Sequence, residues 1–254
     1  MQTYNGWQNL PTEQSKDIWY ELKSAKQSQK ALLLISDTGL GKSNTIKQFA
    51  IKNKAHTYTV VVGDSYKLSD VVDAILFELG VHQFEYRTGV RGKLSLIAKK
   101  LQEVKAISGK PVIILDEAEN LKPSVLKMIK ELYDSVIEHS SIVMIGTAQI
   151  LETIHNKRKR NRQSVPQLWR RFKAGVRYIS PLEKARDFTP FFDLHIPDQE
   201  NLKDLLMEMY DNYRELNNYL DPVLRYASDN GIEVTEELFR MIHNLPAKKM
   251  RKAS

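Results

Sequence analysis

Short apolar runs alternate with amphipathic segments over the first part of the chain. The segments between the runs repeat apolar residues at spacings of three and four, the period of a helix buried on one side. The strand-like runs are Ala31–Ile35, Thr57–Val62, Val112–Leu115, Ile142–Ile145 and Val176–Ile179, and the helical segments are Ser43–Lys52, Ser69–Leu79, Leu94–Ile107 and Ser124–Ile137. This alternation predicts an α/β fold with a five-stranded, mostly parallel sheet covered by helices on both faces.

The pattern changes at both ends of this region. Thr12 can cap a helix that runs to Lys26 and places Ile18, Trp19 and Leu22 on one face. Beyond Pro181 strand-like runs are absent, and Leu202–Tyr210, Leu216–Tyr226 and Glu236–Ile242 have helical spacing. We therefore predict four parts: an N-terminal approach helix within 1–28, an α/β core at 29–180, a small all-helical lid at 181–246 and a basic tail at 247–254.

Composition restricts the chemistry. The chain has 254 residues and no cysteine, which excludes disulfides, thiolate metal sites and cysteine nucleophiles, so any metal would be bound by oxygen. No run of about eighteen apolar residues is present, and the N-terminus lacks the order of charged and apolar residues that marks a signal peptide. We expect a soluble cytoplasmic protein that has no membrane partner.

The positive charge of the chain is concentrated in one segment. The net charge is +7, and nine Lys or Arg with no acid lie between Thr153 and Leu182. This segment alone carries more positive charge than the whole chain, so the remainder is slightly acidic. Such a concentration indicates a polyanionic partner more than uniform basicity would.

The first apolar run leads into a glycine-containing loop and then a helix. The segment Ser36–Ser43 matches the Walker A pattern at its last three positions, Gly41, Lys42 and Ser43, but has Ser36 where the first glycine is usual. Backbone N–H groups and a helix N-terminus can converge there on phosphate oxygens, the lysine can reach the β and γ phosphates, and the serine hydroxyl can bind Mg²⁺. An ordinary strand–turn–helix junction is the alternative. The predicted ATP contacts are Thr38, Gly39, Leu40, Gly41, Lys42, Ser43 and Asn44.

A second apolar run ends in two adjacent carboxylates. Asp116 and Glu117 follow Val112–Leu115, an arrangement typical of a Walker B strand. Asp116 would hold Mg²⁺, and Glu117 would orient and polarise the attacking water. A helix cap followed by a first-turn acid is the alternative. The next strand ends in Thr147–Gln149, where a polar side chain would face the γ-phosphate, and Thr147 or Gln149 could help to position the water. A helix cap is the simpler interpretation of Thr147 taken alone.

These features in this order resemble an AAA+ ATPase. More narrowly, the chain is similar to the Mu phage transposition protein B and related transposon target-selector ATPases. The resemblance extends over nearly the whole chain and includes Lys16–Trp19, the phosphate loop, Phe77–Gly80, Ile113–Leu121, Met144–Thr147 and the helical lid. It implies a P-loop AAA+ nucleotide-binding core and a Mg²⁺-dependent ATPase, and Ser36 leads us to expect slow hydrolysis.

The resemblance also implies that a neighbouring subunit completes each ATP site. Arg170 or Arg171 in Leu168–Phe172 stands where the inserted arginine is expected, although a solvated helix face is the alternative for either. Arg214 in the lid would contact the nucleotide of its own subunit, and Asn212 stands where the family usually has glycine.

Members of this group assemble as rings or helical filaments on double-stranded DNA. The matching stretches imply phosphate contacts from Tyr66, Lys67, Arg87, Arg91, Lys93, Lys99 and Lys100. Lys157–Arg162 is a second candidate on a predicted loop, for which a solvated surface is the alternative; its DNA candidates are Arg158, Lys159, Arg160 and Arg162. Phosphate contacts predict salt-sensitive binding with little sequence preference.

The function implied by the resemblance is an ATP-dependent DNA-binding homo-oligomer that selects targets for transposition and activates a transposase partner. Two alternatives stay open. A replicative helicase loader would share the ATPase core and DNA binding. A nucleotide-switched signalling or defence scaffold would use the same core without a need for the basic segment.

Overall fold

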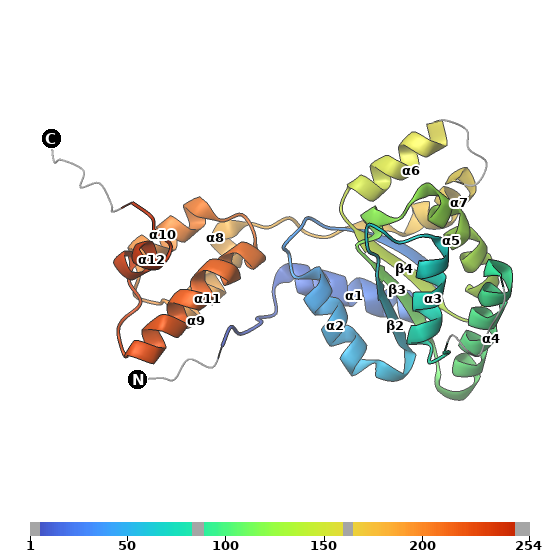
Figure 1. Cartoon of the computed structure of the whole chain (residues 1–254), viewed down its shortest axis with the longest axis horizontal. Coiled ribbons are helices and arrows are strands. Elements are labelled where there is room, and N and C mark those ends of the chain that lie inside the picture. The colour runs from blue at the N-terminus through green and yellow to red at the C-terminus, as the bar shows by residue number, and fades with distance from the viewer. Residues whose placement is uncertain (1–5, 83–88, 160–164, 247–254) are drawn as a thin grey trace. The chain divides into compact units, whose positions relative to one another are not determined.

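The computed structural model describes residues 6–82, 89–159 and 165–246 (Figure 1). The chain divides into two compact units, which are described separately. The sheet unit contains Gln14–Thr38 and Lys42–Pro181. The helical unit contains the described residues of the N-terminal segment up to Glu13, the loop tip Gly39–Gly41 and the described residues from Leu182 onward.

One parallel sheet organises the sheet unit, and its five strands have the order β2-β3-β4-β1-β5. The strands are β1 (Ala31–Ile35), β2 (Thr57–Val61), β3 (Val112–Asp116), β4 (Ser141–Gly146) and β5 (Val176–Tyr178). The central strands β1, β3 and β4 are buried along their whole length, whereas the edge strands β2 and β5 are partly exposed. Such buried, predominantly apolar central strands are typical of a sheet that is covered on both faces.

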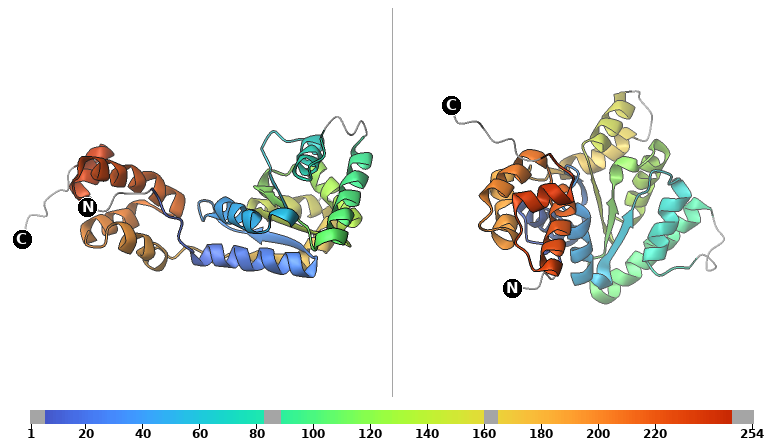
Figure 2. Two further views of the ribbon diagram at one scale, coloured as in Figure 1. Left: turned by 90° about the horizontal axis from the view of Figure 1, so that it is seen from below. Right: turned by 60° about the vertical axis from the view of Figure 1, so that its left-hand side comes forward.

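Helices cover both faces of the sheet (Figure 2, right), and alternate residues of each central strand belong to opposite apolar clusters. Leu32 and Leu34 of β1 pack with α1 and α2, while Leu33 and Ile35 pack with the layer on the other face. The first layer consists of α1 (Glu13–Ser28) and α2 (Lys42–Lys52). The second contains α3 (Leu68–Glu78), α4 (Val90–Ser108), α5 (Pro123–Val136), α6 (Gln149–Lys159) and α7 (Val165–Phe172). The predicted α/β class with a five-stranded sheet is confirmed, and each predicted strand lies within two residues of the observed bounds.

Within the described ranges, three short 3₁₀ helices connect these elements: η1 (Lys54–His56), η3 (Ala118–Asn120) and η4 (Lys173–Gly175). Glycine is required in η4, because a Cβ on Gly175 would lie 2.1 Å from the main-chain oxygen of Ala31. This close approach allows the chain to enter β5 directly beside β1.

The prediction that Lys157–Arg162 forms a loop is wrong for its first three residues, because α6 continues to Lys159. The basic residues obscured the helical pattern, since the described part of α6 contributes Ile150 and Ile154 to the core, with Leu151 partly buried against it. The helix α7 was also not predicted, although Val165, Leu168 and Phe172 form its buried face.

The helical unit has its own apolar core. It contains α8 (Lys184–Asp187), α9 (Thr189–His195), α10 (Glu200–Met209), α11 (Tyr213–Asn230) and α12 (Glu236–Ile242). The N-terminal segment is part of this unit, because Trp7 stacks on Phe191 and His195 with ring centroids 5.3 and 5.1 Å apart. Leu40 of the loop tip is buried in the same core. In the described part of the chain, every helix is too short or too polar to cross a membrane.

Candidate nucleotide-binding and hydrolysis site

The carboxyl ends of β1, β3 and β4 meet at one edge of the parallel sheet, which is where ligands bind in open α/β folds. The Ser36 N–H donates to the Gly146 carbonyl at 3.0 Å, and the Val62 N–H donates to the Asp116 carbonyl at 2.9 Å. These main-chain bonds continue the pairing of β1 with β4 and of β2 with β3. They hold the segments that follow the strands in a fixed order along the edge.

The loop after β1 uses glycine where its backbone requires it. Gly39 and Gly41 have φ angles of +75° and +79°, which side chains rarely adopt. Ser36, in contrast, does not have a positive φ angle, and it is only 4% exposed. Its backbone conformation therefore tolerates a side chain, which explains why serine can replace the usual first glycine.

Lys42, the first residue of α2, lies over the loop that precedes it. Its Nζ donates to the carbonyls of Ser36 at 3.1 Å and of Asp37 at 2.6 Å. Thr38 is exposed and Asn44 is half-buried. An ammonium group at the N-terminus of a helix is suited to a phosphate bound there.

Ser43 and Asp116 meet as a hydroxyl–carboxylate pair. The Ser43 hydroxyl donates to Asp116 Oδ2 at 2.7 Å, and the Glu117 N–H donates to Asp116 Oδ1 at 2.9 Å. Asp116 is 1% exposed. Two hard oxygen donors fit Mg²⁺, which commonly takes few protein ligands and completes its shell with phosphates and water. The described residues contain no group of three or more His, Asp or Glu arranged for a metal, so a bound ion would need those additional ligands.

Glu117 follows in an uncommon backbone conformation. Its φ of +54° places it in the left-handed region, although it is not glycine, and its side chain is exposed. Such conformations cost about 1–3 kcal/mol and are concentrated at functional sites. The carboxylate is 3.4 Å from Asn120 Nδ2 and remains open to solvent on its other side.

Thr147 lies at the end of the neighbouring strand β4. The Thr147 N–H donates to Glu119 Oε2 at 3.2 Å. The Thr147 Oγ1 is buried and makes no hydrogen bond within the described residues. A buried hydroxyl without a partner has the capacity to bind a ligand or a water molecule.

The loop tip and the first turn of α11 belong to the helical unit. The Arg214 N–H donates to the Gly39 carbonyl at 3.3 Å, while the Arg214 side chain is exposed. Asn212 caps α11 by accepting from the Glu215 N–H at 3.0 Å. A Cβ on Gly39 would lie 2.3 Å from Asn212 Oδ1, so this contact also requires glycine in the loop.

Arg170 and Arg171, the two candidates for the arginine that completes a neighbour's ATP site, differ in their contacts. Arg171 donates from Nε to Asp134 Oδ1 at 2.5 Å and lies over the Tyr133 ring at 5.7 Å. Arg170 is exposed, and its side chain makes no hydrogen bond or ion pair within the described residues. Arg171 therefore contributes to packing within the sheet unit, whereas the side chain of Arg170 is accessible to solvent.

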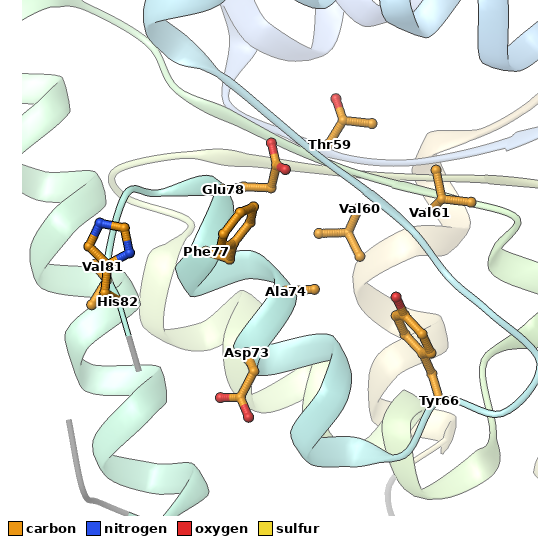
Figure 3. A pocket seen from close by; sticks show the side chains of 10 residues that line it. All are labelled: Thr59, Val60, Val61, Tyr66, Asp73, Ala74, Phe77, Glu78, Val81 and His82. Atoms are coloured by element: carbon orange, nitrogen blue, oxygen red, sulfur yellow. The ribbon is translucent and has the colours of Figure 1, made fainter. Parts of the chain in front are cut away.

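The DNA candidates are also distinguished by their surroundings. Tyr66 is half-buried at one end of a cavity of about 770 Å³ beside β2, with His82 at the other end (Figure 3). Lys93 pairs with Asp73 at 2.6 Å and Lys100 pairs with Glu103 at 3.2 Å.

Among the other DNA candidates, four are exposed: Lys67, Arg91, Lys99 and Lys159. Arg87, Arg160 and Arg162, and the side chain of Arg158, lie outside the described residues.

Sequence reasoning did not identify Glu119 and Asn120 as part of the site. Both lie on η3, immediately after the predicted carboxylate pair. The sequence signal for them was two consecutive polar side chains after the carboxylate pair. Their contacts could not be inferred from it, because the partners Val62 and Thr147 follow other strands.

Comparisons with known proteins show the family and the fold of the chain. The family model described as AAA domain matches residues 25–154, more than half of the chain. Cdc6p from Pyrobaculum aerophilum has a similar structure, with a TM-score of 0.65 and 16% identity, covering 91% of this chain and 66% of that protein. The chain thus spans just under two thirds of that relative's length.

Two further solved structures have the same fold. The ORC2 protein of Aeropyrum pernix, determined as ADPNP and ADP complexes, has a TM-score of 0.62 and 14% identity over 95% of this chain and 69% of that one. Domain III of the Thermotoga maritima replication initiation protein DnaA has a TM-score of 0.56 and 17% identity over 91% of both chains. Among curated proteins, none matches the sequence.

Proposed function

Because the chain belongs to the AAA domain family, we propose that it is a Mg²⁺-dependent ATPase whose ATP-bound form oligomerises on double-stranded DNA without strong sequence preference. The observation that carries this proposal is the Ser43–Asp116 contact at 2.7 Å, with Glu117 directly beside it. Ser43 and Asp116 would supply the oxygen pair that binds the metal, and Glu117 would supply the base that activates water. A phosphate-binding loop alone would account for nucleotide binding but not for hydrolysis.

The residues of the site have distinct proposed roles. Lys42 and the loop N–H groups bind the phosphates, and Ser43 and Asp116 hold Mg²⁺, which supplies charge neutralisation for the leaving phosphate when bound. Glu117 accepts a proton from the attacking water, and the Thr147 hydroxyl orients that water. Arg214 would contact the nucleotide of its own subunit.

Arg170 of a neighbouring subunit would stabilise developing charge on the γ-phosphate. Oligomerisation would thereby depend on ATP, and loss of the γ-phosphate would favour dissociation.

DNA binding rests on the charge of the chain and on the exposed cations of α4 and α6. Arg91 and Lys99 lie exposed on α4, and Lys159 ends α6. Phosphate contacts from such residues would bind duplex DNA with a strong dependence on salt. We propose that this DNA-bound oligomer acts in transposition, selecting target DNA and activating a transposase.

A replicative helicase loader or initiator is the second candidate. The observation that favours this candidate is that the similar solved structures include proteins named for replication initiation. The two candidates differ in the protein partner. Binding of a transposase to the DNA-bound oligomer would support the first, and binding of a hexameric helicase would support the second.

Electron microscopy with duplex DNA tests the shared part of the proposal. Rings or filaments should form with a non-hydrolysable ATP analogue and be absent without nucleotide. The variant Lys42→Ala should lose both nucleotide binding and ATP-dependent DNA binding, with exposed Lys47→Ala on α2 as a matched control. Equal DNA affinity with and without ATP would contradict the proposal and favour the signalling or defence scaffold.

A further inference from the structure

A cavity of about 460 Å³ lies beside the carboxyl ends of α1 and α2, two helices on one face of the sheet (Figure 1). Trp19 of α1 and Phe49 of α2 are among its lining residues, with ring centroids 5.1 Å apart. Gln27, His56 and Lys110, which also line it, precede β1, β2 and β3. The amino ends of parallel strands meet at one edge of a sheet, so this cavity lies at the edge opposite to the candidate ATP site.

The charge around this cavity is positive. Lys23, Lys26 and Lys110 line it, and Lys52 Nζ lies 5.2 Å from the centre of the Trp19 ring. Its lining residues in the described part of the chain include no carboxylate. The carboxyl ends of α1 and α2 each add about half a negative charge, which leaves the four lysines with a surplus of about three positive charges. Such a concentration of charge in a concave site attracts anions.

Two acidic residues of α1 lie on a different side of that helix. Asp17 Oδ2 accepts from the Ser180 N–H at 3.1 Å. Glu21 Oε2 lies 3.8 Å from Arg177 Nε. Both partners belong to β5 or follow it directly. The helix therefore directs these two carboxylates toward β5 and its lysines toward the cavity, where the carboxylates do not neutralise them.

Hydrogen bonds hold two of the lysines at the cavity. Lys26 is half-buried, and its Nζ donates to Asn53 Oδ1 at 3.0 Å. Asn53 is fixed in turn, because its Nδ2 donates to the Phe49 carbonyl at 3.0 Å. Lys110 Nζ donates to the Gln27 carbonyl at 2.5 Å. Burial lowers the pKa of Lys26, because it disfavours the charged ammonium, and a bound anion would act in the opposite direction.

The size and the walls of the cavity indicate the kind of anion. Pockets for small molecules usually measure about 300–1,000 Å³, and this cavity falls within that range. The lysines converge on a hollow rather than forming a row along an open surface, which a duplex backbone would need. Trp19 offers an aromatic surface to a heterocyclic base, while the ammonium groups offer donors to phosphate oxygens.

We propose that this cavity is a second nucleotide-binding site, which takes a free nucleotide with at least two phosphates. The phosphates lie among Lys23, Lys26 and Lys110, and the base lies against Trp19. The site goes beyond the proposed function and does not depend on hydrolysis of ATP at the other edge of the sheet. The helix α2 begins at the phosphate loop and ends at this cavity, so the two sites occupy opposite ends of one helix.

Fluorescence of Trp19 in the full chain tests the site. The chain has three tryptophans, so Trp7→Phe and Trp169→Phe leave Trp19 as the only one. Lys42→Ala, added to the same protein, removes binding at the phosphate loop. This reporter protein is titrated with ADP, with inorganic pyrophosphate, which lacks the base, and with adenosine, which lacks the phosphates. Sodium sulfate at equal ionic strength measures the general effect of salt, and calorimetry of the same titrations detects binding independently of fluorescence.

ADP should bind the reporter protein saturably, at one per chain, and change the fluorescence of Trp19. Pyrophosphate should bind more weakly, and adenosine and sulfate should give no saturable change. Lys26→Gln and Lys110→Gln should each weaken ADP binding about tenfold or more, because each removes a charged hydrogen bond to phosphate. The matched control Lys47→Gln removes one charge from an exposed position of α2 and should keep the affinity within about twofold.

Four results would overturn the inference. The first is no binding of ADP by fluorescence or calorimetry, and the second is equal affinity for ADP and pyrophosphate. The third is an unchanged affinity in Lys110→Gln and in Lys26→Gln, with thermal unfolding showing that both are folded; Lys110 is exposed, so its variant reports even if Lys26→Gln does not fold. The fourth is tighter binding of a single-stranded oligonucleotide than of ADP, which would assign the cavity to a nucleic-acid strand. A parental protein without ATP hydrolysis would contradict the proposed function and leave this inference standing.

Discussion

Arg170 and Arg171 are adjacent in sequence, yet the structure predicts opposite effects when each is replaced by alanine. Replacing Arg171 removes its 2.5 Å ion pair with Asp134, its bond to the Gln167 carbonyl at 3.0 Å and its position over Tyr133. A partly exposed ion pair contributes about 0.2–1 kcal/mol and an exposed cation–π contact about 0.5–1 kcal/mol. Arg171→Ala should therefore destabilise the sheet unit by about 1–2 kcal/mol. Arg170→Ala, at an exposed residue, should stay within about 0.5 kcal/mol of the parental stability.

Urea unfolding followed by tryptophan fluorescence measures this difference, because Trp169 lies on the same helix. The effect of Arg171→Ala should also depend on pH. Burial alone would raise the pKa of Asp134, but hydrogen bonds from Arg171 and Lys130 lower it. A lowered carboxyl pKa contributes stability at neutral pH that is lost as the pH falls through the folded-state pKa. The difference between Arg171→Ala and the parental protein should shrink over that range.

The rate of ATP hydrolysis should respond to the two substitutions in the opposite order from stability. Arg170→Ala should reduce kcat of the assembled oligomer by about a thousandfold if Arg170 acts in trans, as arginine fingers do. A variant Arg171→Ala that keeps its stability and loses hydrolysis, beside a fully active Arg170→Ala, would refute the reasoning and reverse the assignment.

Three further predictions concern other parts of the chain. Burial lowers the pKa of His195, so the stability that this residue contributes to the helical unit should be complete above about pH 6.5. It should fall at lower pH, because the imidazole of the unfolded chain then binds a proton. If the thermal midpoint of His195→Phe has the same pH dependence as that of the parental protein, this prediction is wrong. Gly175→Ala should destabilise the sheet unit by about 1–3 kcal/mol, because its Cβ would meet the Ala31 carbonyl, and an unchanged urea midpoint would contradict the clash. Neutralising the basic residues around the end of α6 should weaken the salt dependence of DNA binding. The slope of log affinity against log salt concentration should fall by about one unit for each phosphate that the protein no longer neutralises. An unaltered slope would show that these residues lie outside the interface. The residues to neutralise are Arg158, Arg160 and Arg162.

The sequence predicted the central sheet well because burial on both faces leaves a continuous apolar run. All five residues of β1 are buried, and the same holds for β3. The helix α6 escaped prediction for the opposite reason, since few of its residues reach the core and its basic end resembles a solvated loop. Local pattern identifies an element only where packing constrains most of its residues.

For the site, residue type and order indicated the chemistry, but the partners depend on the fold. Ser43 and Asp116 were expected to act together, and a hydrogen bond of 2.7 Å joins them. The bonds of Asn120 with Val62 and of Arg171 with Asp134 span strands and helices that the sequence does not align. The tolerance of Ser36 likewise follows from a backbone angle, which no residue pattern specifies.

The central claim is that Glu117 activates water at a site that binds ATP through Lys42, Ser43 and Asp116. The most direct measurement compares ATP hydrolysis and ATP-dependent DNA binding in the parental protein and in Glu117→Gln. The variant should bind ATP and remain on DNA, while its hydrolysis falls by about 10²–10⁴-fold, since only the base is lost. Hydrolysis by Glu117→Gln at the parental rate would contradict the claim.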